Sequence, residues 1–281
     1  MSISAGAEEP THADHCVCGG SVTVGNHAHD TTVPQWTAWN GGAITYTDNV
    51  AYIYLSADVT IGSTINVTSG NTLNLCLNGY KLIAGDFTGS ALFVADGATL
   101  NLTDCSNTTG YGNMDATSGL WTAATESGNC NLTGGVITGF TTSQYGGGVF
   151  NQGTFNMYGG NIAGNGAING GLITGGTGTS NSSATKEGGA IYAKTNATVN
   201  IYSGNIAGNS AGLGGGIYGI ASTANIYGGC IIGNTQGAIN LVADNGDQHN
   251  IVNSTLNLHG GKVMYNHAES EYSNEDRKSV V

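Results

Sequence analysis

The pentapeptides TLNLC at positions 72–76 and TLNLT at positions 99–103 decide the fold, because the same pattern recurs along the chain. Each copy carries an Asn between two apolar residues. Five more copies follow: NCNLT at 129–133, TFNMY at 154–158, TVNIY at 198–202, TANIY at 223–227 and TLNLH at 255–259. Successive Asn residues lie 27, 30, 25, 44, 25 and 32 positions apart. A period near 25 residues with insertions is typical of a solenoid coil.

The residues that flank each Asn predict a core wall, because alternate side chains of a strand face the same side. One column consists of Leu73, Leu100, Cys130, Phe155, Val199, Ala224 and Leu256, and the other of Leu75, Leu102, Leu132, Met157, Ile201, Ile226 and Leu258. Further apolar positions recur six residues after the Asn (Ile137, Ile162, Ile206, Ile231 and Val263) and seven to nine residues before it. We therefore expect three short strands per coil around one core. The fold class is all-β: a parallel β-helix of about seven coils, right-handed by the general rule for parallel crossovers.

Gly and Asn recur between the apolar segments, where the coil must turn. Gly-Gly pairs at 147–148, 188–189 and 215–216 allow sharp corners and positive φ angles. A further Asn column is expected to stack at another corner, with amides bonded from coil to coil: Asn165, Asn209, Asn234 and Asn266.

The chain divides into three parts. Residues 1–42 form a leader and a small N-terminal cap that contains Cys and His, with Trp36 and Trp39 as an apolar plug over the open end of the core. Residues 43–268 form the β-helix, and residues 269–281 form a charged tail that is flexible or marks a truncation point. Insertions interrupt the period at 106–125, 168–187 and about 244–250.

The composition excludes several classes of partner. Six Lys plus Arg against 18 Asp plus Glu give a net charge of −12, which argues against nucleic acid and anionic lipid. No apolar stretch is long enough to cross a membrane. The opening MSISAGA is too short for a signal peptide but reads like the small-residue end of one, so we expect a secreted or cell-surface location.

Phrases such as GGAIYA, GGGIYG and NIAGNSA, together with TLNLCLNGYKL, resemble the right-handed parallel β-helix repeats of bacterial surface proteins. They are similar to the GGAI-type repeats of polymorphic outer-membrane proteins and autotransporter passengers, and to secreted β-helix proteins of Gram-positive gut bacteria. The broader superfold is that of pectin lyase. The resemblance covers residues 43–268 and implies a fold rather than an activity, since this superfold includes lyases, glycosidases, adhesins and inert stalks.

The residues between the core columns face outward in rows of Thr, Asn and Tyr. These rows either support strand stacking or form a platform for sugar rings, because aromatic faces bury apolar sugar faces and amides bond hydroxyl groups. A flat Thr lattice also suggests ice binding, but here the second column is Asn. The candidate ligand-binding residues are Tyr158, Tyr202, Tyr227, Asn156, Asn200 and Asn225.

Catalysis has weaker support in the sequence. Enzymes of this superfold that cleave acidic polysaccharides use Arg or Lys near the substrate, and here Arg277 is the only Arg. A glycosidase needs two carboxylates across a cleft. Asp96 and Glu126 both stand five residues before a repeat Asn, so they are the candidate pair, with solvated corner residues as the alternative.

Two groups of residues suggest metal ions. His15, Cys16, Cys18 and His27 provide the imidazoles and thiolates of a tetrahedral zinc site in the cap, with a Cys16–Cys18 disulfide or an unstructured leader as alternatives. Asp244 and Asp247 offer oxygen ligands for calcium, with a plain turn as the alternative. Cys76, Cys105, Cys130 and Cys230 are expected to be unpaired residues in or near the core.

The sequence as a whole predicts an extracellular adhesin-like or scaffold module that binds a glycan or a host glycoprotein. A glycoside-acting enzyme and a passive stalk that associates end to end are the alternatives, and no cofactor is required for the leading function.

Overall fold

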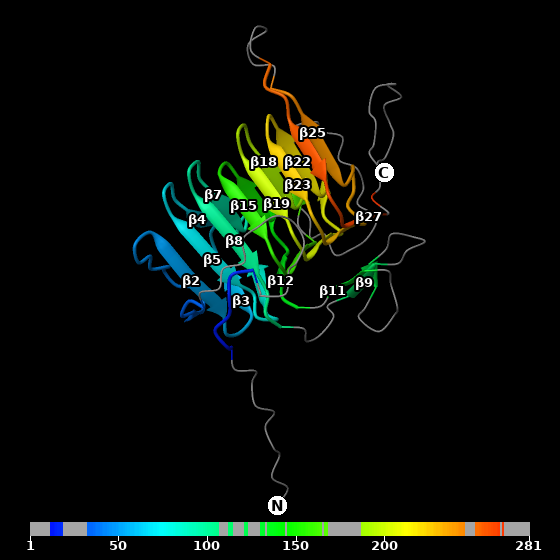
Figure 1. Ribbon diagram of the computed structural model, residues 1–281. Coiled ribbons are helices and arrows are strands. Elements are labelled where there is room, and N and C mark those ends of the chain that lie inside the picture. Colours follow the sequence, from blue (N-terminus) through cyan, green and yellow to red (C-terminus); the bar gives the residue numbers. More distant parts are fainter. Residues whose placement is uncertain are drawn as a thin grey trace, which may run out of the picture.

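The computed structural model describes residues 12–18, 33–106, 112–114, 121–122, 130–132, 134–143, 145–164, 166–167, 187–244, 251–264 and 266. Within these ranges the chain is an all-β parallel solenoid whose short strands stack coil upon coil (Figure 1). Three long sheets run along it, all with parallel pairing. None of the described segments is a helix of the length and apolarity needed to cross a membrane.

The first sheet contains the Asn-bearing strands and has eight members. In spatial order they are β1 (Thr37–Trp39), β2 (Val50–Leu55), β5 (Thr72–Cys76), β8 (Thr99–Thr103), β15 (Thr154–Met157), β19 (Thr198–Ile201), β23 (Thr223–Ile226) and β26 (Thr255–Leu258). We call it the Asn sheet.

The second and third sheets form the other walls of the coil. The second has the order β27 (Lys262–Met264), β24 (Cys230–Ile232), β20 (Asn205–Ala207), β16 (Asn161–Ala163), β12 (Val136–Thr138), β6 (Lys81–Ala84) and β3 (Val59–Ile61). The third has the order β25 (Ile239–Val242), β22 (Ile217–Ile220), β18 (Ile191–Ala193), β14 (Val149–Asn151), β7 (Leu92–Val94) and β4 (Ile65–Val67). A small parallel sheet of β13 (Thr141–Thr142), β17 (Gly166–Ala167) and β21 (Ser210–Ala211) lies at one corner.

The strand register explains the repeat. Leu73 pairs with Leu100, Leu100 with Phe155, and the same column continues through Val199 and Ala224 to Leu256. The predicted column that begins at Ile137 is equally in register, through Ile162, Ile206 and Ile231 to Val263. Apart from Ala224, which is also buried, these side chains belong to one hydrophobic core or pack against it. The core walls predicted from the spacing are therefore confirmed on these strands.

One copy of the repeat does not form a coil, and the prediction for it was wrong. The NCNLT segment contributes β11 (Cys130–Leu132), which pairs antiparallel with β9 (Gly112–Met114), and β9 also pairs with β10 (Trp121–Thr122). β8 pairs directly with β15, so the small sheet of β9, β10 and β11 lies beside the solenoid and outside its stacked coils (Figure 1). Five residues of local pattern fit either arrangement, because antiparallel and parallel strands share the same side-chain alternation.

Seven coils are nevertheless present in the described chain. The first begins with β2, which lacks the motif and carries Tyr52 where β5 carries Asn74. The other six begin with β5, β8, β15, β19, β23 and β26.

Amide ladders and glycines shape the corners. Asn209 donates to Asn234 and Asn234 to Asn266, at 2.9 and 2.8 Å, which confirms that part of the predicted corner ladder. Asn165 lies outside the described residues. Gly188 has a φ of 71°, and a Cβ at Gly215 would collide with the carbonyl oxygen of Thr235 in the next coil. A side chain at either corner would therefore strain the turn or push the coils apart.

The two tryptophans of the N-terminal part lie on opposite sides of the Asn sheet. Trp39 lies opposite Leu55 on β2 and packs into the core, as the plug prediction requires. Trp36 is also buried, but it packs on the outer side of the Asn sheet, where its ring meets Tyr52 at a centroid distance of 5.6 Å.

Cys230 is disulfide-bonded, so the expectation of an unpaired thiol there was wrong. Cys76 is a buried free thiol, as expected, whereas Cys105 is a free thiol at an exposed position. The side chain of Cys130 lies outside the described part of the chain.

Candidate functional site

The outer face of the Asn sheet carries an unbroken ladder of side-chain amides. Each Asn donates to the Asn of the preceding coil at 2.7–2.8 Å, in the order Asn257, Asn225, Asn200, Asn156, Asn101 and Asn74. Asn74 ends the ladder on the carbonyl of Ala51 at 3.1 Å. Each amide inside the ladder thus uses one N–H and one oxygen lone pair on its neighbours, and only the remaining capacity can serve a ligand.

A stack of aromatic rings runs beside this ladder. Tyr158, Tyr202 and Tyr227 stack at centroid distances of 4.9 Å with interplanar angles of 4°, and His259 continues the stack at 4.7 Å. Burial raises the pKa of Tyr158 to about 12, and that of Tyr202 is also raised. Because the rings cover one another face to face, the stack offers ring edges to the solvent. A sugar cannot lie on the internal ring faces, which limits the platform expected from sequence.

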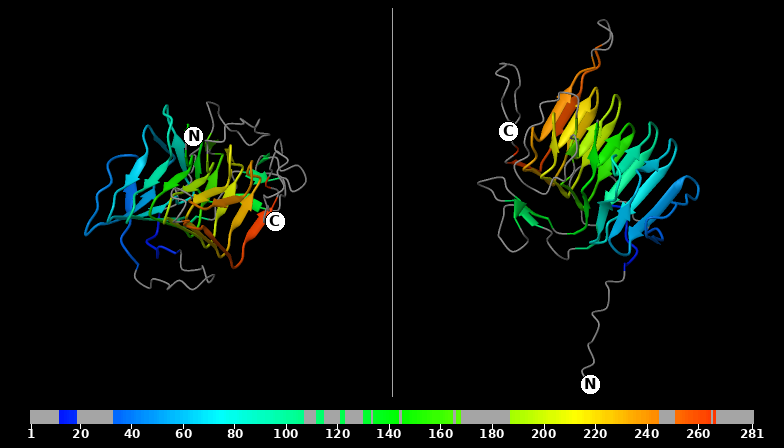
Figure 2. Two further views of the ribbon diagram at one scale, coloured as in Figure 1. Left: turned by 90° about the horizontal axis from the view of Figure 1, so that it is seen from above. Right: turned by 180° about the vertical axis from the view of Figure 1, so that it is seen from behind.

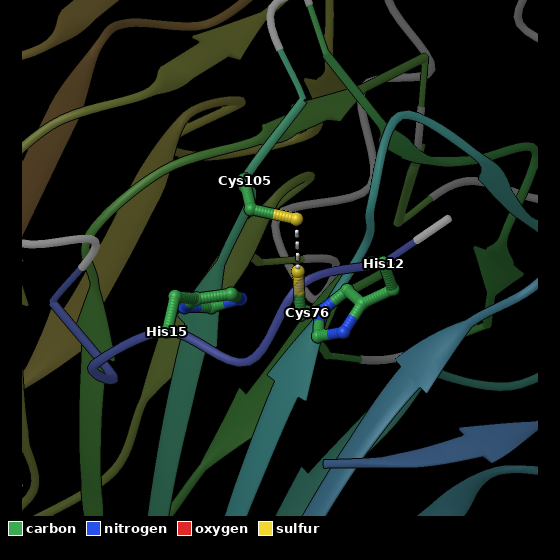
Figure 3. A group of neighbouring side chains, drawn as sticks. All are labelled: His12, His15, Cys76 and Cys105. Carbon is green, nitrogen blue, oxygen red and sulfur yellow. Dashed lines mark hydrogen bonds between the residues drawn. The ribbon is translucent and has the colours of Figure 1, made fainter. Parts of the chain in front are cut away.

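A cluster of two imidazoles and two thiols lies at the N-terminal end of the same face (Figure 3). Cys76 ends β5, and Cys105 stands two residues beyond the end of β8, so adjacent coils supply the two sulfurs. His12 and His15 come from the segment 12–18. One potential ligand atom from each residue lies within 4.8 Å of all the others, and the two sulfur atoms are 3.4 Å apart.

Hydrogen bonds connect the side chains of this cluster to one another and to the backbone. His15 Nδ1 donates to the carbonyl of Cys16 at 2.7 Å, because a carbonyl can only accept. The Nε2 atom of His12 is buried and makes no hydrogen bond among the described residues, whereas the His15 side chain interacts with the Cys105 sulfur. The Cys76 thiol donates to Cys105, which lowers the pKa of Cys105 to about 4 and raises that of Cys76.

The two histidines titrate differently. Burial lowers the pKa of His12. Burial also acts to lower the pKa of His15, but the neighbouring Cys105 and the bond to Cys16 outweigh it, so the pKa of His15 is raised.

Aromatic packing and one carboxylate hold the segment 12–18 on the sheet. His12 stacks on Tyr54 of β2 at 3.9 Å and 4°, and His15 stacks on Trp36 at 4.6 Å. The Trp36 indole N–H donates to the carbonyl of His15 at 2.8 Å, and its backbone N–H donates to Asp14. The segment is therefore docked on the outer face of the first coils.

Of the described residues expected to bind zinc, only His15 belongs to the cluster. Cys16 lies within the described chain but outside the cluster, Cys18 is buried near Tyr158, and His27 is not among the described residues. Cys76 and Cys105 could have been found only by combining the coil register, which places Cys76 beside Thr103, with the path of the leader across the sheet.

The predicted carboxylate sites are less well defined. Asp96 lies exposed on the turn after β7, and Glu126 falls outside the described residues. Asp244 accepts a hydrogen bond from Thr195 at 3.2 Å, whereas Asp247 is not described.

A second aromatic group lies on the outer side of the third sheet and was not singled out from sequence. Phe93, Phe150, Tyr192 and Tyr218 occupy successive coils in register. Tyr145 stacks on Tyr192 at 4.5 Å. Burial raises the pKa of the nearby Glu187, although the Tyr218 hydroxyl opposes this shift. The signal available in sequence was the aromatic residue that follows the apolar position in LFV, VFN, IYA and IYG.

No protein-family model, curated protein or solved structure matches this chain at a significant level.

Proposed function

We propose that the protein is an extracellular binding module whose Asn sheet holds an extended, neutral glycan or the glycan of a host glycoprotein. The observation that carries the proposal is the register of three polar rows: Thr, Asn and Tyr recur at equivalent positions from β15 to β23. A surface that repeats every coil offers the same contacts to each unit of a repeating ligand, and such contacts add through multivalency.

The charge and the exposed chemistry favour this class of ligand. With a net charge of −12, the protein repels phosphate-rich and uronic-acid polymers, so an uncharged polysaccharide is the better partner. Tyrosine ring edges, Thr hydroxyls and the unused amide capacity can bond sugar hydroxyls. Contact with ring faces is confined to the ends of the stack, because Tyr202 is covered on both sides.

The proposed location follows from the sequence resemblance to β-helix repeats of bacterial surface proteins and from the disulfide at Cys230. Disulfides persist mainly in oxidising compartments outside the cytosol.

Binding is tested with immobilised neutral polysaccharides and a glycan array. The triple variant Tyr158→Phe, Tyr202→Phe and Tyr227→Phe keeps the ring stack but removes three hydroxyls, and we expect at least a tenfold rise in Kd. Tyr145→Phe, which lies beside the third sheet against Tyr192, is the matched control and should bind normally. Unchanged binding by the triple variant would remove the Asn sheet from the proposal.

The same panel addresses the two other classes of function. Turnover of any polysaccharide, abolished by Asp96→Asn or Glu126→Gln, would replace the binding module with a glycoside-acting enzyme. Absence of every ligand, with end-to-end filaments visible by electron microscopy, would favour a passive stalk.

A further inference from the structure

We propose that His12, His15, Cys76 and Cys105 bind one zinc ion, which fastens the segment 12–18 to the second and third coils of the solenoid. This inference does not depend on the proposed glycan function, because none of the four residues is among those proposed to contact the glycan.

The spacing of the ligand atoms fits the ion. Zinc binds Cys sulfur at about 2.3 Å and His nitrogen at about 2.0–2.1 Å in a tetrahedron, which places neighbouring ligand atoms about 3.3–3.8 Å apart. The two sulfur atoms are already 3.4 Å apart, and all four ligand atoms lie within 4.8 Å of one another. Side-chain rotations that move the two sulfur atoms apart by about 0.4 Å and bring the most distant ligand atoms about 1 Å closer together complete the site.

The hydrogen bonding and burial of the imidazoles favour metal coordination. The bond from Nδ1 of His15 to the Cys16 carbonyl leaves the lone pair of a neutral ring on Nε2. Metal-bound histidines generally use their second nitrogen in this way, which fixes the ring orientation. The Nε2 atom of His12 is buried without a hydrogen-bond partner in the described chain, a costly arrangement that coordination would relieve.

Surrounding groups hold the thiols in place. Cys105 contacts the Asn78 side-chain oxygen at 3.3 Å, and Asn78 donates to the carbonyl of Leu55 at 3.0 Å. Asp104, next to Cys105, accepts from the backbone of Gly79 and Ser106 at 3.2 and 2.8 Å. The turn that carries Cys105 is thereby tied to the preceding coil before any metal arrives.

The ligand set selects the ion. Two sulfur and two nitrogen ligands suit zinc, whereas calcium and magnesium require oxygen. Two thiolates also balance the charge of a divalent ion. The competing chemistry is a Cys76–Cys105 disulfide, which would leave both histidines without a metal.

A zinc ion here would link parts of the chain about 60 to 90 residues apart in sequence. Because the unfolded chain has no preformed site, the free energy of binding would stabilise the docked segment and the first coils. Removal of the metal should therefore release the segment 12–18 first.

The experiment uses the full chain, reduced and stripped of metal with a chelator, then titrated with zinc against a chromophoric competitor. We expect one equivalent per chain. Cobalt in place of zinc should give the strong visible absorption of a tetrahedral thiolate site. Loss of outer-shell partners alone typically costs 10–100-fold in affinity, so Cys76→Ser, Cys105→Ser or His15→Gln should weaken binding by at least about 100-fold.

Cys16→Ser is the matched control, because Cys16 lies in the same segment but outside the cluster, and it should bind zinc within about twofold of the parent chain. Circular dichroism checks that each variant is folded. His15→Gln serves if a substitution at the buried Cys76 prevents folding. Zinc binding below one equivalent by the reduced chain, equal binding by His15→Gln, or a Cys76–Cys105 disulfide that persists in the reduced preparation would each overturn the proposal.

Discussion

Figure 2 shows the solenoid from two further sides, with its N-terminal coils in blue and its C-terminal coils in orange. The two ends follow the same sequence pattern, but their core side chains are buried to different degrees. At the N-terminal end, Leu73 and Leu100 have no exposed surface, and the segment 12–18 and Trp36 lie over the outer face of the first coils. At the C-terminal end, Leu256 in the same column is half-buried, and Leu258 is 48% exposed. A coil buries its core residues only when a neighbour covers it on each side, and β26 stands at the edge of its sheet in the described chain.

The largest difference between the two regions is expected from core truncation. Leu100→Ala should lower the free energy of unfolding by about 2–5 kcal/mol, since it removes a fully buried side chain and leaves a cavity. Leu256→Ala should cost less than half as much, because part of that side chain already meets water. Urea unfolding followed by circular dichroism measures both. Equal losses would mean that the last coil is as well covered as the third.

Substitutions in the Asn ladder should also lower the free energy of unfolding more in the covered coils than in the last coil, but by less than the core truncations do. Asn200→Ala removes the amide that donates to Asn156 and accepts from Asn225. It should lower the free energy of unfolding by about 1–2 kcal/mol. Asn257→Ala removes only the donor to Asn225 and should cost roughly half of that. Urea midpoints of the two variants give the comparison. A more damaging change at Asn257 would show that the end of the ladder has partners beyond the described coils.

The smallest effect is expected from pH at Glu187, between the covered coils and the open end. Its pKa is raised by burial, so the folded state binds more protons than the unfolded state just above the ordinary Glu pKa of about 4.3. Stability should therefore fall slightly as the pH rises from about 4 through the folded pKa, and Glu187→Gln should flatten this slope. Thermal melts between pH 4 and 7 test this, and an identical slope in the variant would refute it.

Much of the fold was predictable because the core repeats in every coil. The register of Leu73, Leu100 and Phe155 follows from a pattern that any parallel solenoid must satisfy. The prediction for the copy around Asn131 was wrong because five residues specify a strand but not the strand with which it pairs. The Thr, Asn and Tyr rows were also predicted to share one face, but the stacking that hides the faces of Tyr202 depends on side-chain rotation that spacing does not reveal.

The metal-type cluster was only partly predictable. The sequence drew attention to His15 because Cys and His gather around it within a few residues. Cys76 and Cys105 were assigned to the core on their apolar surroundings, yet both lie beside the imidazoles of a segment some 60 or more residues away.

The sequence by itself determined the solenoid, the three strands of each coil and the outward rows, because these rest on local alternation repeated many times. Only the tertiary structure decided which copy leaves the coil, how the N-terminal segment crosses the outer face of the Asn sheet, and which thiols meet its histidines. Those outcomes depend on contacts between distant segments. Each of these contacts occurs only once in the described chain, so no repeated pattern in the sequence predicts it.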